Sequence, residues 1–335
     1  PHLQYDRFQL PAFDAHVYVA MAERPAFFTV APWGYRLLAP WLAAVVPAAS
    51  PVRGFYILTW LSLAGAGLLL FAWLRRLGHG PRASLLGVLL FGLSGPIAAA
   101  LDYPFVADPL CLCLLVAFLL AYEASAGLAV LALIAVLGAL TKEILLAVLP
   151  LLFVAALRQT SSVGGARRWC VAAGRATLAA LPAFVVTWAL RFWWAPHLRG
   201  GDLPPSVTSL ADGIVLVLVS WRSWWLPALV SGLVPLAVLG GVLRRPAWPF
   251  LRRYGYLIAL YGALPFAAGV YVGTDERPRE FFSGDVPRLM LHLVPFLIPL
   301  GLLALERVLG SRNLSPAPEG WRVPRLIRYA VAALA

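Results

Sequence analysis

Apolar tracts about as long as a lipid bilayer is thick recur along this 335-residue chain. A membrane-spanning helix needs ~20 mostly apolar residues. Six tracts approach or reach that length, at 54–74, 83–101, 169–190, 224–243, 254–272 and 287–307. Three shorter tracts, at 107–122, 124–141 and 144–157, fit spans that are tilted or shielded by protein. We therefore predict an all-α, polytopic membrane helix bundle with about nine spans.

The composition agrees with a membrane protein and disfavours a soluble domain. Charged residues make up 13% of the chain, whereas a soluble domain is typically about 25% charged. The net charge of +12 would suit nucleic acid, but the arginines cluster at the ends of apolar tracts. Short loops rich in Lys and Arg stay cytoplasmic, so the charge indicates topology and we expect no nucleic-acid partner. The sequence also has no Walker A, dinucleotide-binding or HExxH motif.

One orientation satisfies every strong tract. It places four Arg-rich loops in the cytoplasm, at 75–82, 158–168, 244–253 and 307–328. With Arg175, which lies near the inner end of the tract 169–190, sixteen of the 27 Lys and Arg then lie on the inner side, and 12 of the 15 carboxylates lie outside. The outer segments are 1–53, 102–108, the turn 141–143, 191–223 and 273–288. Because elaborated loops favour function on their side, we predict that the active face is outward. We expect the chain to be a multi-pass protein of a bacterial inner (plasma) membrane.

The predicted topology divides the chain into an external loop, 1–53, and a transmembrane bundle, 54–335. Two short interfacial helices are expected in the loop. The first covers 14–24, with Asp14 as its N-cap. The second covers 37–49, where prolines bound an apolar segment that fits an interfacial or re-entrant helix. The chain starts without Met and ends in a new apolar segment, so we expect further spans beyond both ends.

Several ionisable residues of the outer segments are candidates for function. Asp14 and Tyr18 share a helix face, and Asp14 is either an ordinary N-cap or a general base at the membrane surface. Arg36 either extends to the lipid headgroups or binds phosphate through its guanidinium group. Asp102 and Asp108 bracket a short turn. Asp108, which precedes a proline, either opens a helix or joins Asp102 in holding a hard cation or a sugar.

Two further pairs lie at the ends of later tracts. Lys142 and Glu143 separate two apolar tracts, and Lys142 is the only lysine in the chain. Ionisable residues at membrane depth are costly and usually functional, so we expect Lys142 to face a phosphate, with Glu143 as its counter-ion. Arg288 and His292 are four residues apart at the outer end of the last tract, where they would share a helix face. We expect this pair to bind an anionic ligand.

Together these features resemble the GT-C-type integral-membrane glycosyltransferases. The resemblance rests on Asp14 in an outer loop, the stretch 35–40 (YRLLAP), the TKE sequence at 141–143, and the DVPR sequence at 285–288 that opens a late span. It covers roughly residues 5–305. It implies a hexosyl- or pentosyltransferase whose donor is a polyprenyl-phosphate-linked sugar.

The resemblance also implies residue roles. Asp14 would be the catalytic base that deprotonates an acceptor hydroxyl, and the sugar would transfer with inversion. Arg36, Lys142 and Arg288 would compensate the charge of the leaving phosphate, with His292 also at the donor site. The membrane-embedded helices, in contact with membrane lipid, would bind the prenyl chain.

Tyr18, Asp102, Asp108 and Glu143 are candidates for contacts with the sugar or with a divalent cation, Mg²⁺ or Mn²⁺. The first outer loop lacks a paired acidic motif, so metal dependence stays open. Two other functions also stay open. One is a non-catalytic subunit of a larger membrane complex that keeps this scaffold among partner subunits. The other is a transporter or flippase of a lipid-linked substrate.

Overall fold

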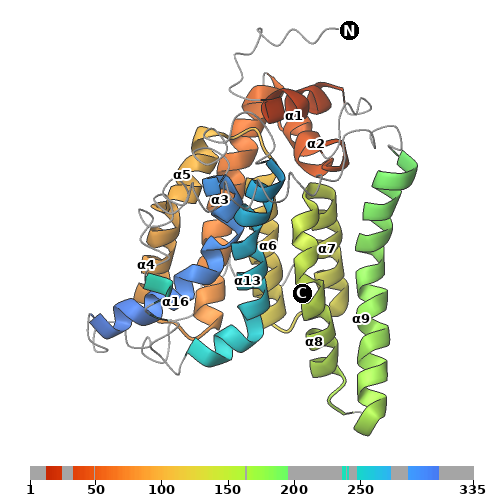
Figure 1. Ribbon diagram of the computed structural model, residues 1–335, viewed down its shortest axis with the longest axis vertical. Helices are drawn as coiled ribbons and strands as arrows, with labels where there is room; N and C mark the ends of the chain where they lie inside the picture. The colour runs from red at the N-terminus through yellow and green to blue at the C-terminus, as the bar shows by residue number, and fades with distance from the viewer. Residues whose placement is uncertain are drawn as a thin grey trace. The chain divides into compact units, whose positions relative to one another are not determined.

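The computed structural model describes residues 13–24, 33–48, 50–162, 164–194, 236–238, 240, 247–272 and 286–308. Throughout these ranges the regular structure is helical, with no strand (Figure 1), which confirms the all-α prediction for them. The helices group into two compact units. Unit 1 takes its described residues from Pro1–Ala66 and Tyr103–Leu203, and unit 2 takes its own from Gly67–Asp102 and Pro204–Arg328.

Two helices in the described ranges are long and apolar enough to cross a membrane. One is α3 (Pro51–Arg76). The other is the stretch Gly165–Trp193, which joins α9 (Gly165–Trp188) to the π-helix η4 (Ala189–Trp194). Both match tracts that the sequence predicts as spans, so the membrane character of the chain is supported by length and composition.

A third span is formed if two shorter helices cross as one. α4 (Pro81–Gly92) and α5 (Gly95–Asp102) meet at a bend of 48°, within the single tract predicted at 83–101. The total of about nine spans stays a prediction. Most of the tract 224–243, and most of the loops 191–223 and 273–288, lie outside the described residues.

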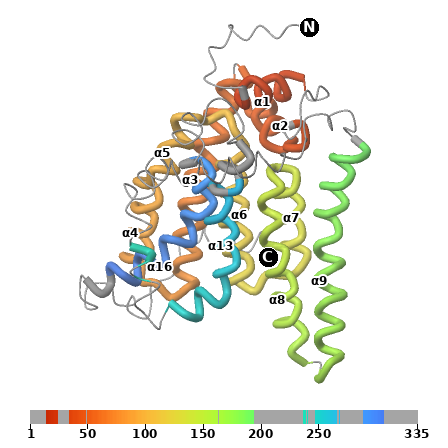
Figure 2. The backbone as a smooth tube through the Cα atoms, in the orientation of Figure 1, coloured from red at the N-terminus to blue at the C-terminus, as the bar shows by residue number. Residues whose placement is uncertain are grey.

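Unit 1 contains the first part of α3, α9 with η4, and seven further helices. These are α1 (Phe13–Glu23), η2 (Trp33–Tyr35), α2 (Leu38–Val45), α6 (Asp108–Glu123), α7 (Leu128–Thr141), η3 (Glu143–Val148) and α8 (Leu149–Gln159). α7 packs against α6, α8 and α9, and α8 packs against α9 (Figure 2). α6 and α8 each carry a proline in their first turn, where its missing N–H is tolerated.

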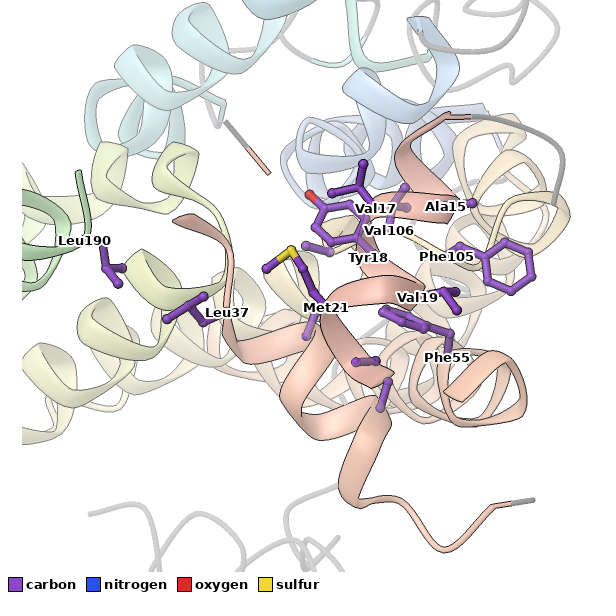
Figure 3. Packing of buried hydrophobic residues seen from close by; sticks show 14 residues of the cluster. Ala15, Val17, Tyr18, Val19, Met21, Leu37, Phe55, Phe105, Val106 and Leu190 are labelled. Atoms are coloured by element: carbon purple, nitrogen blue, oxygen red, sulfur yellow. The ribbon is translucent and has the colours of Figure 1, made fainter. Parts of the chain in front are cut away.

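α1 is packed on most of its sides within unit 1. Val17, Tyr18, Val19 and Met21 are all buried, and they join an apolar cluster that includes Phe55 of α3 (Figure 3). Its first turn is also tied down, because the Ala15 N–H donates to the Tyr103 hydroxyl at 3.0 Å. The helix predicted at 14–24 is thus confirmed, and protein rather than lipid covers much of its surface.

Unit 2 is organised around an aromatic cluster. Trp73 of α3 is fully buried and its ring lies near those of Phe250, Tyr254 and Phe296. Phe250 and Tyr254 belong to α13 (Ala247–Val272). Phe296 belongs to α16 (Val294–Val308), which packs against α4. Burial of aromatic side chains in edge-to-face and tilted arrangements stabilises such a core.

Two details of the predicted helices are wrong. The tract at 287–307 is not one helix, because the chain forms α15 (Val286–Leu289) and the 3₁₀ turn η7 (Met290–His292) before α16. Arg288 and His292 therefore lie on different elements and do not share one α-helical face. Asp14 is not the N-cap of α1, since the helix begins at Phe13 and places Asp14 within its first turn.

Candidate functional site

The site is built on a break between α7 and η3, where the sequence predicts a turn at 141–143. α7 ends at Thr141, and Lys142 adopts an extended backbone with φ −164° and ψ 128°. The chain resumes as a 3₁₀ helix at Glu143. Gly138 makes the tight return possible, because a Cβ there would lie 1.9 Å from Cδ2 of Leu145. Since successive side chains of an extended backbone point in opposite directions, Lys142 and Glu143 find different partners.

Lys142 forms a buried ion pair with Asp108. Its Nζ donates to Oδ1 of Asp108 at 2.5 Å, and the two side chains are 9% and 4% exposed. Asp108 is the first residue of α6, so the prediction that it opens a helix is confirmed. The prediction that Glu143 is the counter-ion of Lys142 is wrong, because Asp108 holds that place from a helix 34 positions earlier.

Glu143 instead binds two arginines. Arg36 donates from Nε to Oε2 at 3.2 Å and from Nη2 to Oε1 at 3.4 Å, and Arg191 donates from Nη2 to Oε1 at 3.3 Å. Arg36 also donates from Nη1 to the Tyr18 hydroxyl at 3.2 Å, and the Arg191 guanidinium lies 5.4 Å from the Tyr35 ring centroid. We refer to Arg36, Glu143 and Arg191 as the arginine–glutamate network. It joins η2–α2, η3 and η4, which are far apart in sequence.

Tyr18 and Glu143 both bond to Arg36, but their pKa values shift in opposite directions. Burial raises the pKa of Tyr18 to about 12, although the Arg36 charge acts against it, so Tyr18 is a neutral phenol at physiological pH. Burial also opposes ionisation of Glu143, but the attraction and hydrogen bonding of Arg36 outweigh it and lower the pKa of Glu143 to about 2. Glu143 is therefore ionised, as an ion pair with two guanidinium groups requires.

Asp14 lies on α1, one helical turn before Tyr18, which bonds to Arg36 of this network. Its side chain is half-buried, and its charge opposes ionisation of Tyr18 one helical turn away. Asp14, Tyr18, Arg36, Asp108, Lys142 and Glu143 all belong to unit 1. Six of the nine predicted site residues thus fall within one compact unit.

The other three predicted residues belong to unit 2. Asp102 is the last residue of α5 and is exposed. Arg288 lies on α15, which packs against α5 and α13. His292 is fully buried, and its ring stacks on Tyr261 with centroids 5.9 Å apart. A histidine enclosed by aromatic packing suits a core position better than contact with a solvated ligand.

A divalent cation finds little support in the described part of the chain. It contains no group of three or more His, Cys, Asp or Glu side chains that could hold a metal ion. Asp108, the most buried of the candidate carboxylates, is bound to Lys142. The residues present do not fit a metal centre there, so we assign no step to a metal.

The sequence reasoning missed Arg191. It is the only Asp, Glu, Lys or Arg among residues 176–198, and an ionisable residue next to so long an apolar stretch is a signal of function. The Trp and Phe residues around it obscure that signal, because such residues are typical of the boundary between membrane and water. The π-helix η4 is a second signal, since π-helical turns occur frequently at functional sites.

Comparisons of the chain with protein-family models, curated proteins and solved structures found no match.

Proposed function

We propose that this chain is a membrane glycosyltransferase of the GT-C type, which moves a sugar from a polyprenyl-phosphate donor to an acceptor hydroxyl. The observation that carries the proposal is the position of Asp14 on α1, one helical turn before Tyr18, whose hydroxyl accepts a hydrogen bond from Arg36 of the arginine–glutamate network. A carboxylate base next to fixed cations is what a sugar transfer with an anionic leaving group requires.

The chemistry needs one proton acceptor and one stabiliser of negative charge. Asp14 takes the proton of the acceptor hydroxyl as the hydroxyl oxygen bonds to the anomeric carbon of the sugar. The bond from that carbon to the phosphate oxygen breaks, and the phosphate leaves with the electron pair. Because the transfer is a single displacement, with attack opposite the leaving phosphate, the anomeric configuration inverts. Arg36 stabilises the charge that grows on the phosphate. It needs no reorganisation to do so, because Glu143 and Tyr18 already hold its side chain.

Lys142 takes a different part from the one that the sequence suggests. Its ammonium group is bound to Asp108 at the buried end of the cluster, so we assign it to positioning the turn that carries Glu143. Arg288 remains a predicted donor-binding residue of unit 2, whereas His292 is fully buried and is no longer assigned to the donor. The outward orientation, the inner membrane and the nine spans remain parts of the same proposal.

The test is Asp14→Asn in nanodiscs with a panel of polyprenyl-phosphate sugars, followed by release of sugar from the lipid. Asn keeps the size of the side chain and removes the base, so we expect donor binding with transfer reduced by at least ~100-fold. Glu23→Gln, an exposed carboxylate on the same helix, is the matched control and should transfer normally. Equal transfer by Asp14→Asn and wild type would refute the role of Asp14.

A non-catalytic subunit is the second candidate, and one observation favours it. Lys142 and Arg36 are both engaged by internal carboxylates, as expected of a network that holds a scaffold together. On this alternative, wild type transfers no sugar from any donor of the panel, and partner subunits co-purify with the chain from the membrane. Transfer by wild type that depends on Asp14 would exclude it.

A further inference from the structure

Arg191 is the more exposed cation of the arginine–glutamate network. Its side chain is 40% exposed, against 15% for Arg36. Arg36 is held by three hydrogen bonds, two to Glu143 and one to Tyr18. Within the described residues, Arg191 donates one, to Oε1 of Glu143. Because a guanidinium group has five N–H donors, Arg191 keeps more donors for a ligand than Arg36 does.

The surroundings of Arg191 indicate where its ligand comes from. Arg191 lies on η4, near the C-terminal end of the long apolar stretch that begins with α9. Trp188, Phe192 and Trp193 next to it are all exposed, and Trp is enriched at the boundary between membrane and water. In the predicted topology the guanidinium group lies at the depth of lipid headgroups, where a lipid reaches it laterally.

Glu143 can release Arg191 without being left unpaired. Its carboxylate accepts two bonds from Arg36 and one from Arg191, so the loss of Arg191 leaves two charged hydrogen bonds in place. The ion pairs of the site also contain three cations, Arg36, Lys142 and Arg191, against the two carboxylates Glu143 and Asp108. The surplus positive charge favours an added anion.

We propose that Arg191 binds the phosphate group of a substrate, and that Glu143 is its counter-ion before the ligand arrives. A phosphate oxygen replaces Oε1 of Glu143 as the acceptor for Nη2 of Arg191, while Arg36 keeps Glu143 in position. Phosphate fits because the guanidinium fork binds it through two parallel bonds. That a lipid carries this phosphate rests on the proposed function and on the interfacial position of η4. Glu143 competes with the ligand and thereby lowers its affinity.

The test measures binding rather than transfer. Purified protein in nanodiscs is titrated with farnesyl phosphate, inorganic phosphate or farnesol, and binding is followed by calorimetry. We expect farnesyl phosphate to bind wild type, and Arg191→Ala to weaken this binding about tenfold or more. Arg191→Lys, which keeps the charge but loses the fork, should lie between them. Arg175→Ala removes another exposed arginine of α9 and should bind as wild type does.

Glu143→Gln separates the proposal from a purely structural role. Gln still accepts a bond from Arg36 but no longer attracts Arg191 by charge, so we expect binding several-fold tighter than in wild type. Binding weakened as much as in Arg191→Ala would show that Glu143 only positions Arg191, and would overturn the exchange. Equal binding by Arg191→Ala and wild type would overturn the phosphate contact. Inorganic phosphate binding as tightly as farnesyl phosphate would assign the site to a free anion.

The outcomes also separate this inference from the proposed function. Binding that depends on Arg191, together with no transfer from any donor, would refute the glycosyltransferase and keep the phosphate site. Transfer that depends on Asp14, together with binding that is unchanged in Arg191→Ala, would support the glycosyltransferase and refute the phosphate site at Arg191. Thermal unfolding of each variant checks that the folded state is kept.

Discussion

Loss of either partner of the Lys142–Asp108 pair should destabilise the protein strongly. The two groups are 2.5 Å apart and their side chains are 9% and 4% exposed, so water cannot replace a missing partner. Asp108→Ala leaves a buried ammonium group without a counter-charge, and Lys142→Met leaves a buried carboxylate. Breaking a buried pair in this way costs about 3–5 kcal/mol. We expect a loss of that order in the free energy of unfolding from each single variant.

The double variant Asp108→Leu with Lys142→Met makes the reasoning refutable. It buries no charge, and replacement of a buried pair by apolar side chains is often neutral, so we expect it to lie much closer to wild type than either single variant. Unfolding by graded SDS in mixed micelles gives the free energies, and Glu23→Gln is the exposed control, expected within about 0.5 kcal/mol of wild type. Single variants that each lose less than ~1 kcal/mol, or a double variant that loses the sum, would refute a coupled buried pair.

Two further predictions concern the turn that carries the site. Gly138→Ala should cost about 1–3 kcal/mol, because the added Cβ would lie 1.9 Å from Cδ2 of Leu145. Gly174→Ala, where a Cβ meets nothing within 4 Å, should be neutral or slightly stabilising, and an equal cost at both positions would contradict the packing of the turn. Glu143 should stabilise the fold fully above its ordinary pKa of 4.5 and lose this contribution as pH falls to about 2. The difference in unfolding free energy between wild type and Glu143→Gln should shrink over that range, whereas a constant difference would contradict the ion pairs.

The long helices and the turn of the site follow from simple patterns in the sequence. α3 and α9 correspond to apolar tracts of spanning length, because a bilayer demands such tracts wherever a helix crosses it. The turn at Lys142 is predicted because charges between two apolar tracts mark a place where the chain leaves the apolar environment. Asp108 opens α6 as expected, since a residue followed by proline suits a helix start.

The pairing of charges could not be predicted, because it depends on tertiary structure. Adjacency in sequence suggests that Lys142 and Glu143 neutralise each other. The extended backbone between the helices turns them apart, and the partners come from 34 residues away for Lys142 and from 107 residues away for the bond between Arg36 and Glu143. Hydrophobic periodicity carries no information on such contacts, and no local motif identifies Asp108 as the counter-ion. The break at η7, which separates Arg288 from His292, likewise lies inside a tract that reads as continuous.

The three cations in the ion pairs of the site are graded by burial, and the gradient assigns their tasks. The Lys142 side chain is 9% exposed and is paired with the still more buried Asp108. The Arg36 side chain is 15% exposed and is bound by Glu143 and Tyr18. The Arg191 side chain is 40% exposed and donates one hydrogen bond to Glu143. The free energy of a buried charge is governed by its internal partner, whereas a partly exposed charge can exchange its partner for a ligand. Substitution of Lys142 should therefore reduce stability first, and substitution of Arg191 should reduce binding first. A chain in which both substitutions affected only stability would have a structural network and no phosphate site.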